Sequence, residues 1–110
     1  MAMNEKRLRG MLGFAMRAGK LVIGTESVCK AMAASKGAPR LVLISADASD
    51  GTKKKLLTKS EFYEIKAVQI NMSADELGSL IGKSFAPMAV GVTDDGFSRE
   101  INKALFGEEI

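Results

Sequence analysis

The sequence predicts an α/β protein, a compact α/β/α sandwich around a four-stranded sheet. Short apolar runs of strand length alternate along the chain with amphipathic segments of helical period, and no internal repeat or linker interrupts this alternation. A chain of 110 residues, 46% of them hydrophobic, can bury one core but hardly two. We therefore expect a single domain over residues 1–110.

The first half of the chain predicts two helices and two strands. Apolar residues recur at helical spacing over about residues 5–17, and the short apolar run at 21–23 predicts a buried strand. A second helix is expected to begin at Gly24-Thr25, with Thr25 as its N-cap, and to end near Lys36-Gly37. The continuous apolar run at 41–44 is typical of a strand that is covered on both faces.

The second half continues the same alternation. A third helix is predicted from Ser49-Asp50 to about Tyr63, and a third strand at 67–70. Ser73 and Glu76 match a capping box at the start of a fourth helix. Pro87 precedes the last predicted strand, at 88–93, and a helix that includes residues 97–105 closes the chain.

The distribution of charge points to a polyanionic partner. Residues 1–66 contain 13 Lys and Arg against 6 Asp and Glu, whereas residues 67–110 contain 3 against 7. This asymmetry favours one basic face for a phosphate backbone and one acidic face left to solvent, rather than scattered solvated charges. No apolar run is long enough to span a membrane, and the lone Cys29 cannot form an internal disulfide. We expect a cytoplasmic protein.

Catalytic groups are scarce in this sequence. It has no histidine, the commonest general base, and Cys29 lies among apolar residues of a predicted helix, where a buried structural thiol is expected. Asp94 and Asp95 could form a metal-binding or acid pair, but capping of the last helix is the favoured interpretation. No phosphate-binding glycine loop occurs. We therefore expect no enzyme, no cofactor, no metal and no small-molecule substrate.

The junction after the first strand is the strongest candidate binding segment. Gly24 lets another backbone approach, and the free N–H groups of the following helix start favour an anion. Lys20 and Lys30 flank this junction, and Glu26 and Ser27 could accept hydrogen bonds from base edges. Taken alone, the same pattern also describes an ordinary strand-to-helix connection.

The pattern of the whole chain resembles the kink-turn-binding ribosomal protein superfamily of the L-seven-Ae and L-thirty-e type, most closely its small bacterial YlxQ-like branch. The resemblance covers about residues 6–103 and keeps both order and spacing. It rests on Leu12-Gly13-x-Ala15-x-Arg17-Ala18-Gly19-Lys20-Leu21-Val22-x-Gly24, Lys30, the segment 41–49, Lys53-Lys54-Lys55, Glu61-Phe62-Tyr63, the segment 76–83 and the segment 90–97. It implies a three-layer α/β/α sandwich with a four-stranded mixed sheet.

The resemblance also implies three RNA-binding segments. They are the helix start from Gly24 through Thr25, Glu26 and Ser27 to Lys30, the end of the second strand at Ala46 and Asp47, and the loop formed by Lys83, Ser84, Phe85, Ala86, Pro87 and Met88. In such a site the helix start reads sheared G·A pairs and the loop packs on a flipped-out nucleotide. From the residues alone, Phe85 has two interpretations, stacking on a base or docking on the core.

This chain departs from the family pattern at the helix start. Many members have Gly-x-Asn-Glu or Gly-x-Lys-Gln there, whereas this chain has Gly24-Thr25-Glu26-Ser27, and an ionised Glu26 offers only acceptors. The leading hypothesis is binding of structured RNA, a kink-turn or related bulged element of ribosomal or other non-coding RNA, with or without the ribosome. The alternative is a protein-interaction module on the same fold.

Overall fold

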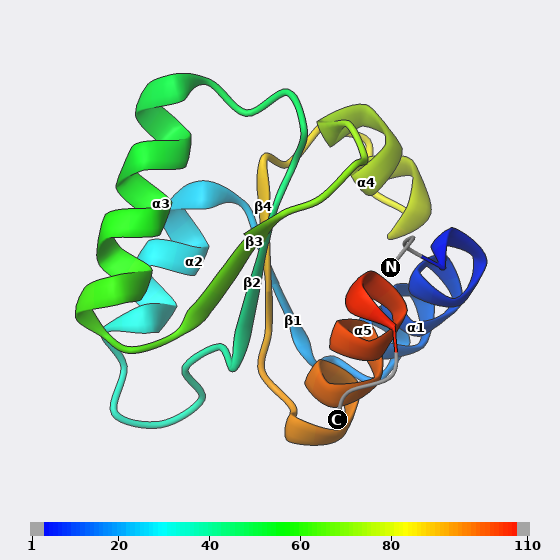
Figure 1. The fold of residues 1–110 in the computed structure, drawn as a ribbon, viewed down its shortest axis with the longest axis horizontal. Helices are drawn as coiled ribbons and strands as arrows, with labels where there is room; N and C mark the ends of the chain where they lie inside the picture. The colour runs from blue at the N-terminus through cyan, green and yellow to red at the C-terminus, as the bar shows by residue number, and fades with distance from the viewer. Residues whose placement is uncertain (1–3, 108–110) are drawn as a thin grey trace.

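A four-stranded sheet forms the middle layer of the computed structural model, which describes residues 4–107. Helices α2 and α3 cover one face of the sheet, and α1, α4 and α5 cover the other (Figure 1). The elements in chain order are α1 (Glu5–Arg17), β1 (Leu21–Ile23), α2 (Thr25–Met32), β2 (Leu41–Ile44), α3 (Asp50–Phe62), β3 (Lys66–Gln69), α4 (Ala74–Leu80), β4 (Ala89–Val92) and α5 (Asp95–Phe106). The predicted sandwich is confirmed.

The sheet is mixed, with the strand order β1-β4-β2-β3. Strand β4 runs antiparallel to both of its neighbours, β1 and β2, whereas β2 and β3 are parallel. The last residues of β1, β2 and β3 and the first residue of β4 therefore lie at the same end of the sheet. This arrangement brings together segments that lie more than sixty positions apart in the sequence, such as Gly24 and Met88.

Two apolar cores lie on the two faces of the sheet, because side chains along a strand alternate between faces. Leu41 and Leu43 of β2 pack with α1 and α5, whereas Val42 and Ile44 pack with α2 and α3. All four are buried, as the continuous apolar run predicts. Cys29 also lies in the second core and is 8% exposed.

Side-chain caps fix the starts of four of the helices. Asn4, Ser49, Ser73 and Asp94 each accept a hydrogen bond from the first turn of α1, α3, α4 and α5. The predicted starts at Ser49 and Ser73, the capping box of Ser73 with Glu76, and the capping role of Asp94 are thus confirmed.

Three local predictions are wrong. Strand β1 is half-exposed rather than buried, because it lies at the edge of the sheet. The N-cap of α2 is Gly24, and Thr25 is the first helical residue. Helix α2 ends at Met32 instead of near Lys36-Gly37. The chain must turn back to the sheet there, and Pro39 lies so close to Gly91 of β4 that an added Cβ on that glycine would be 3.0 Å from Pro39 Cγ.

Candidate nucleic-acid interface

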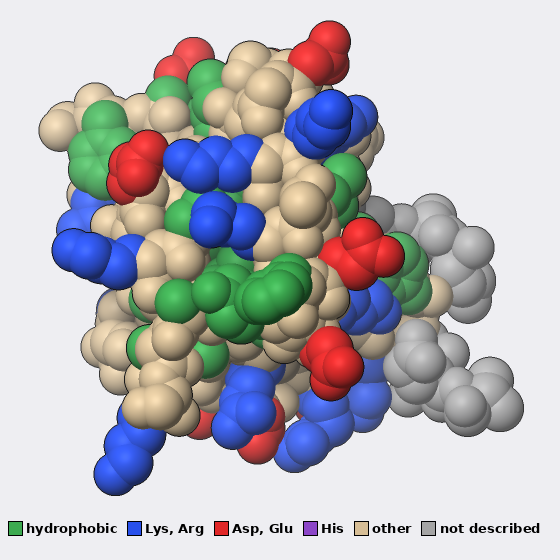
Figure 2. Space-filling model, turned by 90° about the vertical axis from the view of Figure 1, so that its left-hand side faces the viewer, with side chains coloured by type: hydrophobic (Ala, Val, Ile, Leu, Met, Phe, Trp, Pro, Cys, Tyr) green, Lys and Arg blue, Asp and Glu red, His purple; other side chains and the backbone are tan. Residues whose placement is uncertain are grey.

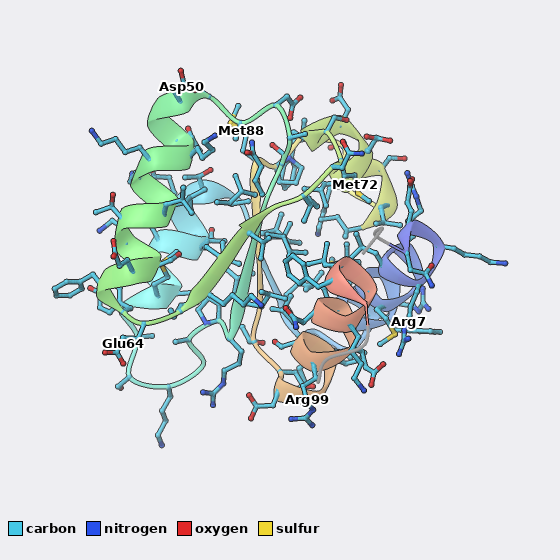
Figure 3. The ribbon with its side chains drawn as sticks, in the orientation of Figure 1. Arg7, Asp50, Glu64, Met72, Met88 and Arg99 are labelled. Carbon is cyan, nitrogen blue, oxygen red and sulfur yellow. The ribbon has the colours of Figure 1, made fainter. Side chains whose placement is uncertain are left out.

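The three predicted binding segments meet at the end of the sheet where β4 begins. The N–H of Gly24 donates to the carbonyl of Ala89 at 2.8 Å, which joins the start of α2 to β4. The N–H of Ser45 donates to the carbonyl of Met88 at 2.9 Å, which joins the end of β2 to the loop before β4. Figure 3 shows Met88 at this edge of the molecule. The sheet thus places the helix start, the end of β2 and the 83–88 loop beside one another.

The start of α2 differs from the other described helix starts. Gly24 adopts φ +99° and ψ 148°, a backbone conformation that glycine tolerates and other residues avoid. No side chain among residues 4–107 caps the first turn, so its N–H groups remain available to an outside acceptor. The helix dipole adds a partial positive charge at the same point. This geometry suits a phosphate or another anionic oxygen.

The 83–88 loop is held against α4 by a close backbone approach. The N–H of Lys83 donates to the carbonyl of Gly78 at 2.8 Å. A methyl group at Gly78 would overlap the carbonyl oxygen of Phe85 and lie 3.2 Å from Pro87 Cδ. Gly78 is therefore required by the loop, a role that its place in a helical pattern did not reveal.

The side chains of the loop divide between core and solvent. Pro87 is buried and Met88 is half-buried, so they anchor the loop. Phe85 is 54% exposed, and Ser84 and Ala86 are exposed as well. The interpretation of Phe85 as a core-docking residue is wrong. Its ring stands in solvent, where it is free to stack on a planar group.

A basic groove lies between α2 and α3 and begins at this end of the sheet. It is lined by Glu26, Ser27, Cys29, Lys30, Ala33, Lys55 and Lys59. Nζ of Lys55 lies 3.5 Å from Oε2 of Glu26, so the acidic side chain is partly compensated. Figure 2 views the molecule from the side of these helices and shows Lys and Arg side chains around an apolar patch. Three cations against one carboxylate make the groove attractive to a phosphate backbone.

Lys55 and Lys59 were not among the residues predicted for the site. Their spacing of four on α3 places them on one side of the helix, and this was the available signal. Nothing in the sequence indicated that this side faces α2. The neighbouring Lys53 points elsewhere, because its Nζ lies 3.4 Å from Oε1 of Gln69. The three consecutive lysines therefore do not act as one patch.

Ala46 and Asp47 lie at the end of β2, and the contacts of Asp47 are internal. The N–H of Ala74 donates to Oδ1 of Asp47 at 2.9 Å, and this hydrogen bond to the charged form lowers the pKa of the Asp47 carboxyl. Ala46 is exposed, and its N–H donates to the carbonyl of Met72 at 2.8 Å. Asp47 thus holds α4 beside β2, and both residues of the pair are exposed.

Gln69 is a further residue that the sequence did not single out. Its Nε2 donates to the carbonyls of Ser45 and Ala46, both at 3.2 Å. The amide therefore fixes the backbone at the end of β2, next to the 83–88 loop. A polar residue at the end of a strand was the only hint.

Lys20 lies away from the other predicted site residues. Its carbonyl accepts from the N–H of Thr93 at 2.9 Å and from the Thr93 hydroxyl at 3.1 Å. Thr93 follows β4, whereas Gly24 pairs with the first residue of β4. Lys20 therefore belongs to the opposite end of the sheet, because the three residues of β1 separate it from Gly24.

Two negative findings apply to residues 4–107. No group of three or more His, Cys, Asp and Glu side chains in this range could hold a metal ion. No described helix is long and apolar enough to cross a lipid bilayer.

The fold and the site together define a class of protein: a three-layer α/β/α sandwich with an uncapped helix start, an exposed aromatic loop and a basic groove at one end of a mixed sheet. The chain belongs to the ribosomal protein L7Ae/L30e/S12e/Gadd45 family, whose model matches residues 6–102. The resemblance found in the sequence is thereby confirmed.

Individual relatives cover nearly the whole chain. It is similar to the RNA-binding protein YlxQ of Enterococcus faecium, with 34% identity over 94% of this chain and 96% of that one. It is also similar to the large ribosomal subunit protein eL30 of Sulfurisphaera tokodaii, with 32% identity over 86% and 87% of the two chains. A solved structure of a protein with unknown function from Bacillus halodurans shares 38% identity, with a TM-score of 0.80 over 89% of this chain and 95% of that one.

Proposed function

We propose that this protein binds structured RNA without transforming it, and that its target is a kink-turn or a related bulged element of ribosomal or other non-coding RNA. One observation carries the proposal. The uncapped start of α2 and the loop with the exposed Phe85 lie beside each other at one end of the sheet. Relatives named as an RNA-binding protein and as a ribosomal protein support the same function. We propose that one domain carries it.

The chemistry of the site suits bent RNA. The N–H groups of α2 and the cations of the groove offer contacts to phosphate oxygens, which position an RNA but do not read its sequence. The ring of Phe85 offers a stacking surface for a base that the bend has turned outward. Glu26 and Ser27 line the same groove, and their oxygens offer acceptors for base amino or imino groups.

The lack of catalytic groups supports a binding role. The sequence has no histidine, and its only cysteine is buried. A free buried cysteine and ribosomal-type relatives also support a cytoplasmic location.

The test is a titration of the protein against a kink-turn RNA and against a copy in which both G·A pairs are replaced. We expect tighter binding to the kink-turn at every salt concentration, because the copy does not present the base edges that the helix start reads. Replacing Phe85 with alanine should cost about 1–3 kcal/mol of binding if one base stacks on it. Equal, salt-sensitive binding to both RNAs would reject specific recognition and leave only electrostatic attraction.

Lys30 tests the groove separately. We expect Lys30→Ala to weaken kink-turn binding by roughly 1–3 kcal/mol if the side chain touches RNA. Lys36→Ala is the matched control, because Lys36 is exposed and lies beyond the end of α2, outside the groove. An equal weakening in both variants would remove Lys30 from the site.

A further inference from the structure

A second basic cluster lies at the opposite end of the sheet from the site described above. We define it by six residues that line one surface depression: the cations Arg40, Lys66, Arg99 and Lys103, the carboxylate Asp95 and the amide Asn102. The N–H of Arg40 donates to the carbonyl of Val92, the last residue of β4, whereas the start of α2 pairs with the first residue of β4. Figure 3 shows Arg99 and Met88 at opposite ends of the molecule.

The cluster is assembled from three elements. Arg40 precedes β2, Lys66 begins β3 beside it, and α5 supplies Arg99 and Lys103. Nζ of Lys66 donates to Oδ1 of Asn102 at 2.8 Å and lies 4.7 Å from the centre of the Phe106 ring. These contacts bring the edge strand and α5 together and fix one cation at the rim.

The positive charge of the cluster is only partly compensated. Asp95 pairs with Arg40 at 3.2 Å, and Glu100 lies 3.9 Å from Lys103. Within residues 4–107, neither Lys66 nor Arg99 forms an ion pair. Four cations against the carboxylates of Asp95 and Glu100 leave an excess of positive charge, and a bound polyanion would relieve its self-repulsion.

The lining chemistry favours a nucleic acid over a protein as the occupant. Protein interfaces are depleted of Lys and Asp at their centres and are anchored by buried aromatic or apolar side chains. Here the only apolar residue that lines the depression is Leu41, which is already buried in the core, and Lys66 lies over the partly exposed Phe106 ring beside it. Cations together with the neutral groups of Asn102 and Ser98 are the donors that contact phosphate oxygens and sugars.

We infer that the second basic cluster binds the phosphate backbone of a second RNA segment without reading its sequence. The protein then connects two RNA segments, one at each end of its sheet. The inference goes beyond the proposed function, and the cluster can bind an RNA duplex whether or not the α2 site recognises a kink-turn.

The first experiment measures binding of the full chain to a plain RNA duplex, without bulges or G·A pairs, over a range of salt concentrations. The variant Arg99→Gln/Lys103→Gln removes two cations of the cluster, and the control Lys6→Gln/Lys54→Gln removes two exposed cations elsewhere. We expect the cluster variant to lower the slope of log affinity against log salt by about 0.9 for each phosphate that it no longer neutralises, and the control to leave the slope nearly unchanged. Equal slopes for the cluster variant and the unmodified chain, or equal reductions in both variants, would overturn the inference.

The second experiment tests the connection between two RNAs. Kink-turn RNA is immobilised, the protein is bound to it, and labelled duplex is added. We expect the cluster variant to retain binding to the immobilised RNA and to fail to capture the duplex. Loss of both activities would mean that the cluster is part of the first site, which would overturn the inference.

The two proposals fail in distinguishable ways. If no form of the protein prefers the kink-turn RNA, the proposed function fails, while duplex binding in solution still tests the cluster. Polyglutamate serves as a protein-like polyanion. If it binds in a cluster-dependent manner while the duplex does not, the occupant is an acidic protein and the inference about RNA is overturned.

Discussion

The close approach of the 83–88 loop to α4 makes Gly78 a sensitive test of how the site is built. In Gly78→Ala the new methyl would overlap the carbonyl oxygen of Phe85 and crowd Pro87. The loop backbone must move by about 1 Å to restore an ordinary van der Waals separation. Because the overlapping atom belongs to the backbone, the loop has to shift as a unit and takes the Phe85 ring with it.

The expected change in stability has two opposing contributions. Overpacking of this kind costs about 1–3 kcal/mol, whereas alanine gains roughly 0.5–1 kcal/mol over glycine inside a helix. We therefore expect a net loss of up to about 2.5 kcal/mol in the free energy of unfolding. We also expect weaker kink-turn binding. Urea unfolding and an RNA titration on the same preparation measure the two effects.

Gly10→Ala is the matched control for Gly78→Ala. Gly10 lies inside α1, and an added methyl there meets no atom within 4 Å. We expect this variant to be more stable by up to about 1 kcal/mol and to bind RNA unchanged. If Gly78→Ala behaves in the same way as Gly10→Ala in both assays, the loop is not held by close backbone contact and the reasoning is refuted.

Three further predictions concern the elements that frame the site. Gly24→Ala should lose about 1–3 kcal/mol of stability, because φ is +99° there although the space is open; an unchanged urea midpoint would contradict this. Ser73→Ala should lose about 0.5–2 kcal/mol, because the N–H of Glu76 loses its cap; a helix signal and midpoint equal to those of the unmodified chain would show that the cap is redundant. The lowered pKa of Asp47 adds stability that is complete above the ordinary value of 3.8 and is lost as the pH falls through the lower folded value. Asp47→Asn should therefore flatten the acid side of the stability profile, and an identical profile would exclude this linkage.

The departure at Glu26 and Ser27 becomes easier to interpret with the structure. The carboxylate of Glu26 lies beside Lys55 in the groove. The pair is exposed, so the contact is weak. An ionised carboxylate offers only acceptors, which suit base amino or imino groups, and it repels phosphates. We therefore expect the RNA preference of this chain to differ in detail from that of members with an amide at this place.

Local interactions explain why so much of the fold was predictable. Ser49 and Ser73 predict the starts of their helices, because a serine oxygen at an N-cap accepts from the N–H groups of the first turn whatever the tertiary structure is. The apolar run of β2 predicts a buried central strand, because apolar side chains on both faces of a strand must be covered. The order and type of the elements could therefore be predicted from short stretches of sequence.

The grouping of the site segments could be predicted only from the family resemblance, which implies which distant segments lie close together in space. Gly24 and the 83–88 loop come together through antiparallel pairing of β1 and β2 with β4. No local pattern shows this pairing, because strand order depends on contacts between distant segments. Lys20 lies at the other end of β1 from Gly24, beside Thr93, and therefore apart from the other predicted site residues.

The sequence by itself determined the alternation of helices and strands, most of the helix starts, the lack of histidine and the excess of positive charge before residue 67. Only the tertiary structure decided how that charge is distributed in space. The prediction of one basic and one acidic face is wrong, because α5 carries Arg99 and Lys103 from the acidic half of the chain to Arg40 and Lys66. Charge along a chain is a local property, whereas a charged surface is made by whichever segments the packing of the core brings side by side.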